Sequence, residues 1–211
     1  MSAGFDVDGD RPYMEEVNVS ETEWNHRYLD ANCIKIHHVR HGAGFPLVLL
    51  HGWPEFWLTW RKNVHPLAES FDIVAPDIRG FGETEKPDLP VLEGYSLDVL
   101  VEDLKGLVDA LNFEKFGIVS HDIGAYIAQG FARKYPDRLR GLLFFNCPYP
   151  GIGCRWVEPD HLGEIWYQSF NQQSWAASLV GASRQTCELY ISLFLSHWSH
   201  APNAFEEDIA S

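Results

Sequence analysis

The chain of 211 residues lacks any long hydrophobic run, and no segment approaches the roughly 18 apolar residues that a bilayer span requires. Its first 16 residues are acidic and contain neither the basic nor the apolar region of a secretory signal. Basic residues are also scarce, with 16 Lys and Arg against 30 Asp and Glu. Phosphate contacts need basic side chains, so we expect neither nucleic acid nor a membrane as partner. The formal net charge of −14 also disfavours anionic substrates.

Cysteine is rare as well, and none of the four cysteines forms a CxxC pair. Together with the missing export signal, this favours reduced thiols in the cytoplasm. Neither Cys nor His falls at a spacing typical of metal ligands, and the pair His37-His38 lies in an alternating segment that predicts a strand. We therefore predict no metal and no cofactor.

The order of apolar segments predicts an α/β fold. Strands are expected at residues 33–40, 46–50, 71–77, 116–120 and 139–148, all but the first as buried runs, with helical patterns between them. This alternation predicts a mostly parallel sheet with helices on both faces. The pattern changes near residue 150, so we divide the chain into 1–149, the α/β part, and 150–211, which is expected to be helical throughout.

Asp122 stands at the turn between a predicted strand and a predicted helix, where functional residues of parallel sheets gather. The small residues Ser120 and Gly124 flank it at two positions on either side, which allows the backbone to double back tightly. This pattern predicts a nucleophile elbow with aspartate in place of serine. The alternative is an ordinary aspartate that caps a helix.

An aspartate nucleophile implies a particular chemistry. A carboxylate is ionised at neutral pH and attacks without the help of a base. Attack on an acyl ester would give a reactive anhydride, whereas attack on an sp³ carbon gives an alkyl ester that water can cleave. The leaving group would then be an epoxide oxygen or a halide, which excludes lipase or esterase chemistry of the serine type.

With these features in place, the chain resembles the epoxide hydrolases of the α/β-hydrolase fold along essentially its whole length. The resemblance rests on the segments HGWPEFW, APDIRGFGETEKPD, SHDIG, EIWYQSF and LFLSHWS. It implies that residues 1–149 are the N-terminal part of the hydrolase core and that 150–211 are the first helices of a cap.

The resemblance also implies roles for individual residues. The backbone amides of Trp53 and Ile123 are expected to form an oxyanion hole, and Tyr167 is expected to protonate the epoxide oxygen after attack by Asp122. The substrate-binding residues would be Trp53, Pro54, Phe56 and Trp57. An apolar pocket of this kind suits a small neutral hydrophobic epoxide, which would become a vicinal diol.

Two alternatives stay open. The HGxP motif and the elbow aspartate are shared with haloalkane and haloacetate dehalogenases, although these place Trp or Arg after the nucleophile where this chain has Ile123. The other alternative is a non-catalytic relic that binds an apolar ligand or a partner.

No residue matches the family's water-activating histidine, its acid partner or its second cap tyrosine. We therefore expect the chain to be truncated within the cap and not to turn over by itself. The preferred epoxide, its enantiomer and the oligomeric state, with a homo-oligomer as one option, stay open.

Overall fold

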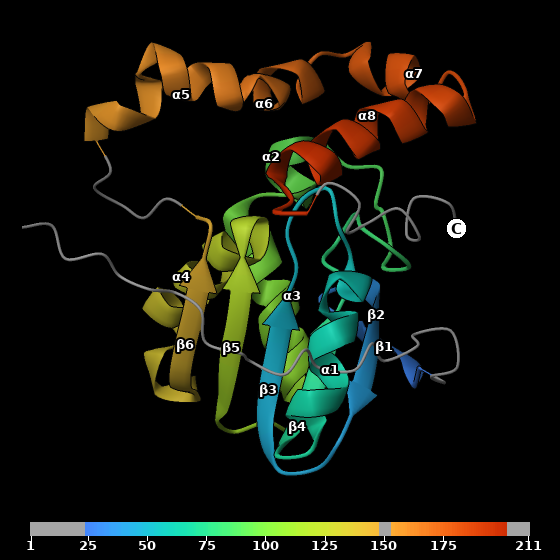
Figure 1. The fold of residues 1–211 in the computed structure, drawn as a ribbon. Helices are drawn as coiled ribbons and strands as arrows, with labels where there is room; N and C mark the ends of the chain where they lie inside the picture. The colour runs from blue at the N-terminus through green and yellow to red at the C-terminus, as the bar shows by residue number, and fades with distance from the viewer. Residues whose placement is uncertain (1–23, 148–152, 202–211) are drawn as a thin grey trace, which may run out of the picture.

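A computed structural model describes residues 24–147 and 153–201. Its centre is a six-stranded sheet in the order β1-β2-β4-β3-β5-β6 (Figure 1). The strands are β1 (His26–Ala31), β2 (Ile34–His41), β3 (Phe45–Leu50), β4 (Phe71–Pro76), β5 (Phe116–His121) and β6 (Leu139–Phe145).

The sheet has an antiparallel and a parallel part. β1, β2 and β4 pair antiparallel, whereas β4, β3, β5 and β6 pair parallel. The β1–β2 hairpin turns through Asn32 and Cys33, which have φ of 46° and 61°. Two successive residues with positive φ are the requirement of the type I′ turn, which is common in two-residue hairpins. The segment that forms β1 was not predicted as a strand.

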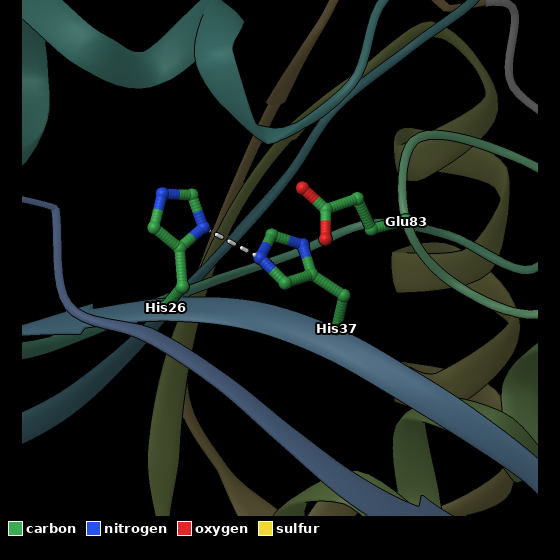
Figure 2. A group of neighbouring side chains, drawn as sticks. All are labelled: His26, His37 and Glu83. Carbon is green, nitrogen blue, oxygen red and sulfur yellow. Dashed lines mark hydrogen bonds between the residues drawn. The ribbon is translucent and has the colours of Figure 1, made fainter.

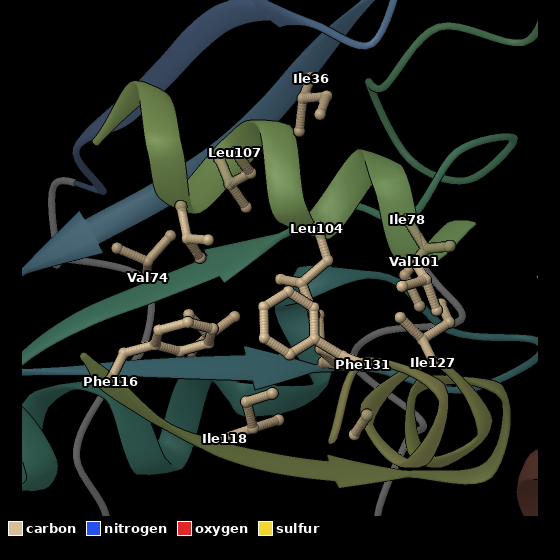
Figure 3. Close-up of a cluster of buried hydrophobic side chains, with 14 of the residues drawn as sticks. Ile36, Val74, Ile78, Val101, Leu104, Leu107, Phe116, Ile118, Ile127 and Phe131 are labelled. Carbon is tan, nitrogen blue, oxygen red and sulfur yellow. The ribbon is translucent and has the colours of Figure 1, made fainter. Parts of the chain in front are cut away.

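Helices cover both faces of the sheet, as predicted. One face carries η2 (Trp57–Trp60) and α1 (Arg61–Ala68), and the other carries α3 (Leu97–Ala110) and α4 (Asp122–Lys134). Successive side chains of a strand alternate between these faces. In β3, for example, Val48 and Leu50 pack toward α3 and α4, while Leu47 and Leu49 pack toward α1. Figure 3 shows the larger cluster, with Phe116 and Phe131 between the sheet and the helices. Two short helices, α2 (Val91–Gly94) and η3 (Pro136–Arg138), lie in the connections.

The remaining helices lie beyond the carboxyl ends of the parallel strands (Figure 1). They are η4 (Gly153–Val157), α5 (Pro159–Glu164), α6 (Trp166–Asn171), α7 (Ala176–Val180) and α8 (Arg184–Trp198). Residues 150–211 were expected to be helical, and between Pro159 and Val180 this helical part is divided into three short helices. By contrast, α8 is continuous and begins with a capping box in which Ser183 and Thr186 exchange hydrogen bonds. No helix in the described ranges has the length and hydrophobicity to cross a bilayer.

The prediction that the last strand is buried is wrong. β6 is the outermost strand of the described sheet, and Leu143, Phe144 and Phe145 are 59%, 37% and 49% exposed. An apolar run shows that a segment can be buried on both faces, but it does not show whether neighbours cover it. The outer edge of the described sheet, formed by β6, is therefore apolar and exposed.

Candidate active site

Asp122 occupies the apex of a sharp turn between β5 and α4. Its φ is 49°, in the left-handed region that residues other than glycine rarely adopt. The backbone around the turn packs directly against its neighbours, which is possible because the glycines there have no Cβ. A Cβ on Gly124 would lie 2.5 Å from the carbonyl oxygen of His51, and a Cβ on Gly52 would lie 2.6 Å from the Cβ of Asp122. The sequence pattern of small residues around Asp122 therefore corresponds to steric contacts in the structure.

The backbone amide of Trp53 donates a hydrogen bond of 2.8 Å to Oδ1 of Asp122. The preceding His51 fixes this loop: its Nδ1 bonds the carbonyl oxygen of Gly52 at 2.9 Å, and its Nε2 accepts from the amide of Ile78 at 2.9 Å. Burial lowers the pKa of His51, so the ring stays neutral and the two nitrogens keep opposite roles. Ile123 lies next to Asp122, partly buried against the core. Its role in an oxyanion hole stays a prediction.

The buried carboxylate of Asp77 holds the far end of the same loop. Its Oδ1 accepts from the amide of Trp57 at 2.8 Å, and its Oδ2 accepts from the amide of Glu83 at 2.9 Å and bonds Nδ1 of His37 at 2.7 Å. Burial alone would raise the pKa of Asp77, but these hydrogen bonds outweigh burial and hold the pKa below its usual value. Gly82 allows the close approach, since a Cβ there would lie 2.1 Å from Oδ2.

His121 adjoins Asp122 in sequence, but its imidazole is held elsewhere. Its Nε2 lies 3.1 Å from Oε2 of Glu55, and its ring stacks on Phe145 at 5.5 Å. Burial works to raise the pKa of Glu55, yet the hydrogen bond and charge of His121, with a hydrogen bond from Thr59, bring this pKa below normal. The pair therefore links the loop after Gly52 to the elbow.

Tyr167 of α6 lies over the loop that contacts Asp122. Its ring stacks on that of Trp53, with centroids 4.8 Å apart and planes 9° from parallel. Burial raises the pKa of Tyr167 and the negative charge of Asp122 raises it further, opposed by a hydrogen bond from Gln168. The phenol is thus kept protonated within the electrostatic reach of Asp122. The structure brings Asp122, Trp53 and Tyr167 together.

Aromatic residues of α8 complete this region, and the sequence analysis did not assign them. Tyr190, Phe194 and Trp198 lie four residues apart on one face of the helix, and all three contact the ring of Trp53. Their helical spacing is the signal that could have identified them. Cys147 lies within the electrostatic reach of Asp122. Burial, and then the charge of Asp122, raise its pKa to about 11, so its thiol stays protonated.

Two of the predicted substrate-binding residues line a cleft, and a third does not. Pro54 and Phe56 border a cleft of about 250 Å³ between the loop and α8. Trp57 is 4% exposed and packs in the core under Trp24 and His26. Asp122 does not line this cleft. The other lining residues are Glu55, Leu58, Thr59, Arg61, Cys187, Glu188, Ile191 and Leu195.

Comparison with known proteins identifies the family. Residues 46–205 match the family described as alpha/beta hydrolase fold. The chain is 36% identical over 197 residues to the soluble epoxide hydrolase of Corynebacterium sp. (strain C12), covering 90% of this chain and 66% of the relative. It is 33% identical over 175 residues to the cis-3-alkyl-4-alkyloxetan-2-one decarboxylase of Shewanella oneidensis, covering 78% of this chain and 54% of the relative.

A solved structure, epoxide hydrolase CorEH without ligand, has a TM-score of 0.79 and 33% identity, covering 89% of this chain and 66% of that one. The chain spans about two thirds of the length of the Corynebacterium relative and about half that of the Shewanella relative. The chain belongs to the α/β-hydrolase fold family, and within it the chain is similar in sequence and structure to epoxide hydrolases.

Proposed function

We propose that this chain carries the nucleophilic half of an epoxide hydrolase, which opens an epoxide to a vicinal diol through an ester on Asp122. One observation carries the proposal: the Asp122 carboxylate stands at the apex of a strained turn, held by the Trp53 amide at 2.8 Å. The similarity to epoxide hydrolases supports it.

The first step follows from the two oxygens of Asp122. Since the Trp53 amide holds Oδ1, Oδ2 is the atom that attacks the less hindered epoxide carbon. A C–O ester bond forms, and the ring C–O bond breaks with its electron pair on the epoxide oxygen. The phenol of Tyr167 donates the proton that this oxygen needs, because an alkoxide is a poor leaving group. Stacking on Trp53 orients that phenol.

The second step is attack by water on the carbonyl carbon of the ester. A base takes the proton of the water, and the amides of Trp53 and Ile123 stabilise the oxyanion on Oδ1. Collapse breaks the acyl C–O bond of the ester, and the leaving alkoxide takes the proton from the base, which releases the diol. The second proton of the water returns to the Tyr167 phenolate, which restores the phenol and the Asp122 carboxylate. All ten histidines lie in the described ranges, and the two that flank the elbow and its neighbouring loop are engaged: His121 with Glu55, and the buried His51 with its loop. We therefore propose that the 211-residue chain forms the ester and does not hydrolyse it.

The substrate class follows from the walls of the site. The rings of Trp53, Tyr167 and Phe194 pack on one another, and the neighbouring cleft adds Pro54 and Phe56. An aromatic wall in a protein of net charge −14 favours a neutral hydrophobic epoxide over an anionic substrate.

We also propose a reducing compartment such as the cytoplasm, because no disulfide joins the four cysteines, all of which are described.

The test is an intact-mass spectrum after incubation with a simple aryl epoxide. The wild-type chain should gain the mass of one epoxide molecule and keep it, whereas Asp122→Asn, matched in shape, should gain nothing. Circular dichroism must show that both chains are folded. Peptide mapping should place the adduct on Asp122. Steady diol production by the chain would refute the assignment of a missing base.

The alternatives give different outcomes in the same experiment. If the chain forms a covalent adduct with a haloalkane but none with the epoxide, the result would favour a dehalogenase. Carbon dioxide release from an alkyl oxetan-2-one would favour the reaction named for the Shewanella relative. A folded chain that reacts with none of these would favour the non-catalytic relic.

A further inference from the structure

Three side chains gather on the α1 side of the antiparallel part of the sheet, away from Asp122: His26 of β1, His37 of β2 and Glu83 of the loop after β4 (Figure 2). The register explains the meeting of the histidines. His37 pairs with Tyr28, so His26 is its diagonal neighbour on the same face of the hairpin. Glu83 reaches the cluster because its amide is bonded to Asp77, which also holds His37.

The geometry of these side chains suits a metal ion. Nδ1 of His26 and Nε2 of His37 are 2.8 Å apart, and the potential ligand atoms of the three residues lie within 4.8 Å of one another. Ligands at about 2.0–2.2 Å in a tetrahedral site stand about 3.3 Å from each other. The histidine nitrogens must therefore separate slightly and the carboxylate must approach. Both changes are available, since His26 and Glu83 are exposed.

The surrounding groups orient the ligands as they do in known metal centres. Nδ1 of His37 lies 2.7 Å from Oδ2 of Asp77, and both side chains are fully buried. With its proton directed at this carboxylate, His37 presents the bare Nε2 to the cluster, which is the carboxylate–histidine arrangement found behind metal ligands. The hydroxyl of Tyr28 donates to Oε2 of Glu83 and orients the third ligand.

We propose that His26 Nδ1, His37 Nε2 and the Glu83 carboxylate bind one divalent transition-metal ion such as Zn²⁺, with a water in the fourth position. Two imidazoles with a carboxylate suit Zn²⁺, Ni²⁺ or Cu²⁺ better than Mg²⁺ or Ca²⁺. The net charge of −14 raises the local concentration of cations. The ion takes the place of the proton between the two rings, and His26 then carries its proton on Nε2. Bound metal would join β1 to β2 and to the loop of residues 77–85.

The test measures Zn²⁺ binding to the tag-free 211-residue chain by equilibrium dialysis. The variants His26→Ala and Glu83→Gln each remove one exposed ligand. His200→Ala is the matched control, because it removes an exposed histidine outside the cluster. We expect one equivalent of Zn²⁺ in the wild type and in His200→Ala, and affinity at least about tenfold weaker in the two ligand variants.

A thermal shift provides a second readout that does not depend on any activity. An ion that binds only the folded chain raises Tm as its concentration exceeds Kd. Zn²⁺ should therefore raise the Tm of the wild type and of His200→Ala but leave His26→Ala unchanged, and Mg²⁺ should shift none of them. Equal Zn²⁺ affinity and equal Tm shifts in all four proteins would overturn the proposal. So would the absence of a bound equivalent in the wild type.

Discussion

Replacing Gly124 with alanine tests whether close backbone packing builds the elbow. In an unhindered helix the change from glycine to alanine stabilises by about 1 kcal/mol. At Gly124 the new Cβ would lie 2.5 Å and 2.6 Å from the carbonyl oxygens of His51 and Leu50. These are backbone atoms at the end of β3, so they cannot rotate away, and helix and strand must separate by at least half an ångström.

The expected magnitude combines two losses. Forcing an extra methyl group into a packed site costs about 1–3 kcal/mol. The same separation weakens the hydrogen bond of 3.1 Å from the Gly124 amide to the carbonyl of His51, worth about 1 kcal/mol. After the gain in helix propensity, we expect Gly124→Ala to lower the free energy of unfolding by about 2 kcal/mol.

Two other helical glycines provide controls. A Cβ on Gly130 would meet the side chain of Val101 at 2.8 Å, which can adjust, and a Cβ on Gly163 would meet nothing within 4 Å. Urea unfolding should therefore rank Gly163→Ala as the most stable, Gly130→Ala as intermediate and Gly124→Ala as the least stable. A Gly124→Ala chain as stable as Gly130→Ala would refute the argument from backbone contact. Adduct formation at the wild-type rate in a destabilised Gly124→Ala would refute the link between elbow and nucleophile.

Three further predictions concern single side chains. Tyr167→Phe keeps the ring but removes the phenol, so ester formation in a single turnover should slow about 100-fold; an unchanged rate would exclude Tyr167 as proton donor. Asp103→Asn removes the negative charge that pairs with Arg79, whose side chain is 5% exposed. The free energy of unfolding measured in urea should decrease by about 3–5 kcal/mol, and a decrease below about 1 kcal/mol would contradict a structural ion pair. Burial, with neighbouring positive charges, lowers the pKa of His38 from 6.5 to about 4. Below pH 6.5 the unfolded chain then binds a proton that the folded chain does not bind. The free energy of unfolding therefore decreases as the pH is lowered, by about 2 kcal/mol from pH 7 to pH 5. His38→Leu should remove that part of the slope, and an unchanged slope would exclude His38 as its source.

Most of the central fold could be predicted because its signals are local. Residues 71–77 and 116–120 were predicted as buried strands from continuous apolar runs, and β4 and β5 occupy these positions. Between these two strands a helical pattern was predicted, and α3, Leu97–Ala110, occupies that interval. In each case neighbouring residues carry both the hydrophobic pattern and the ends of the element.

The edges of the sheet could not be predicted in the same way. The sequence of β1, HRYLDA, has no apolar alternation, and the strand exists because it pairs with β2 around the turn at Asn32 and Cys33. β6 shows the opposite case, since its apolar run gave the correct element but the wrong burial. Pairing and coverage depend on residues distant in the sequence, which a local pattern does not contain.

The same distinction separates the two candidate sites. Ser120, Asp122 and Gly124 stand within five consecutive positions, so the elbow is visible in the sequence. Asp77, in contrast, lies 40, 20 and 6 residues from its partners His37, Trp57 and Glu83, and no spacing rule joins them. One of its oxygens holds the loop that carries Trp53, and the other holds His37 and the amide of Glu83. Because both oxygens belong to one rigid buried carboxylate, the position of the loop beside Asp122 and that of the histidine cluster are fixed by the same group.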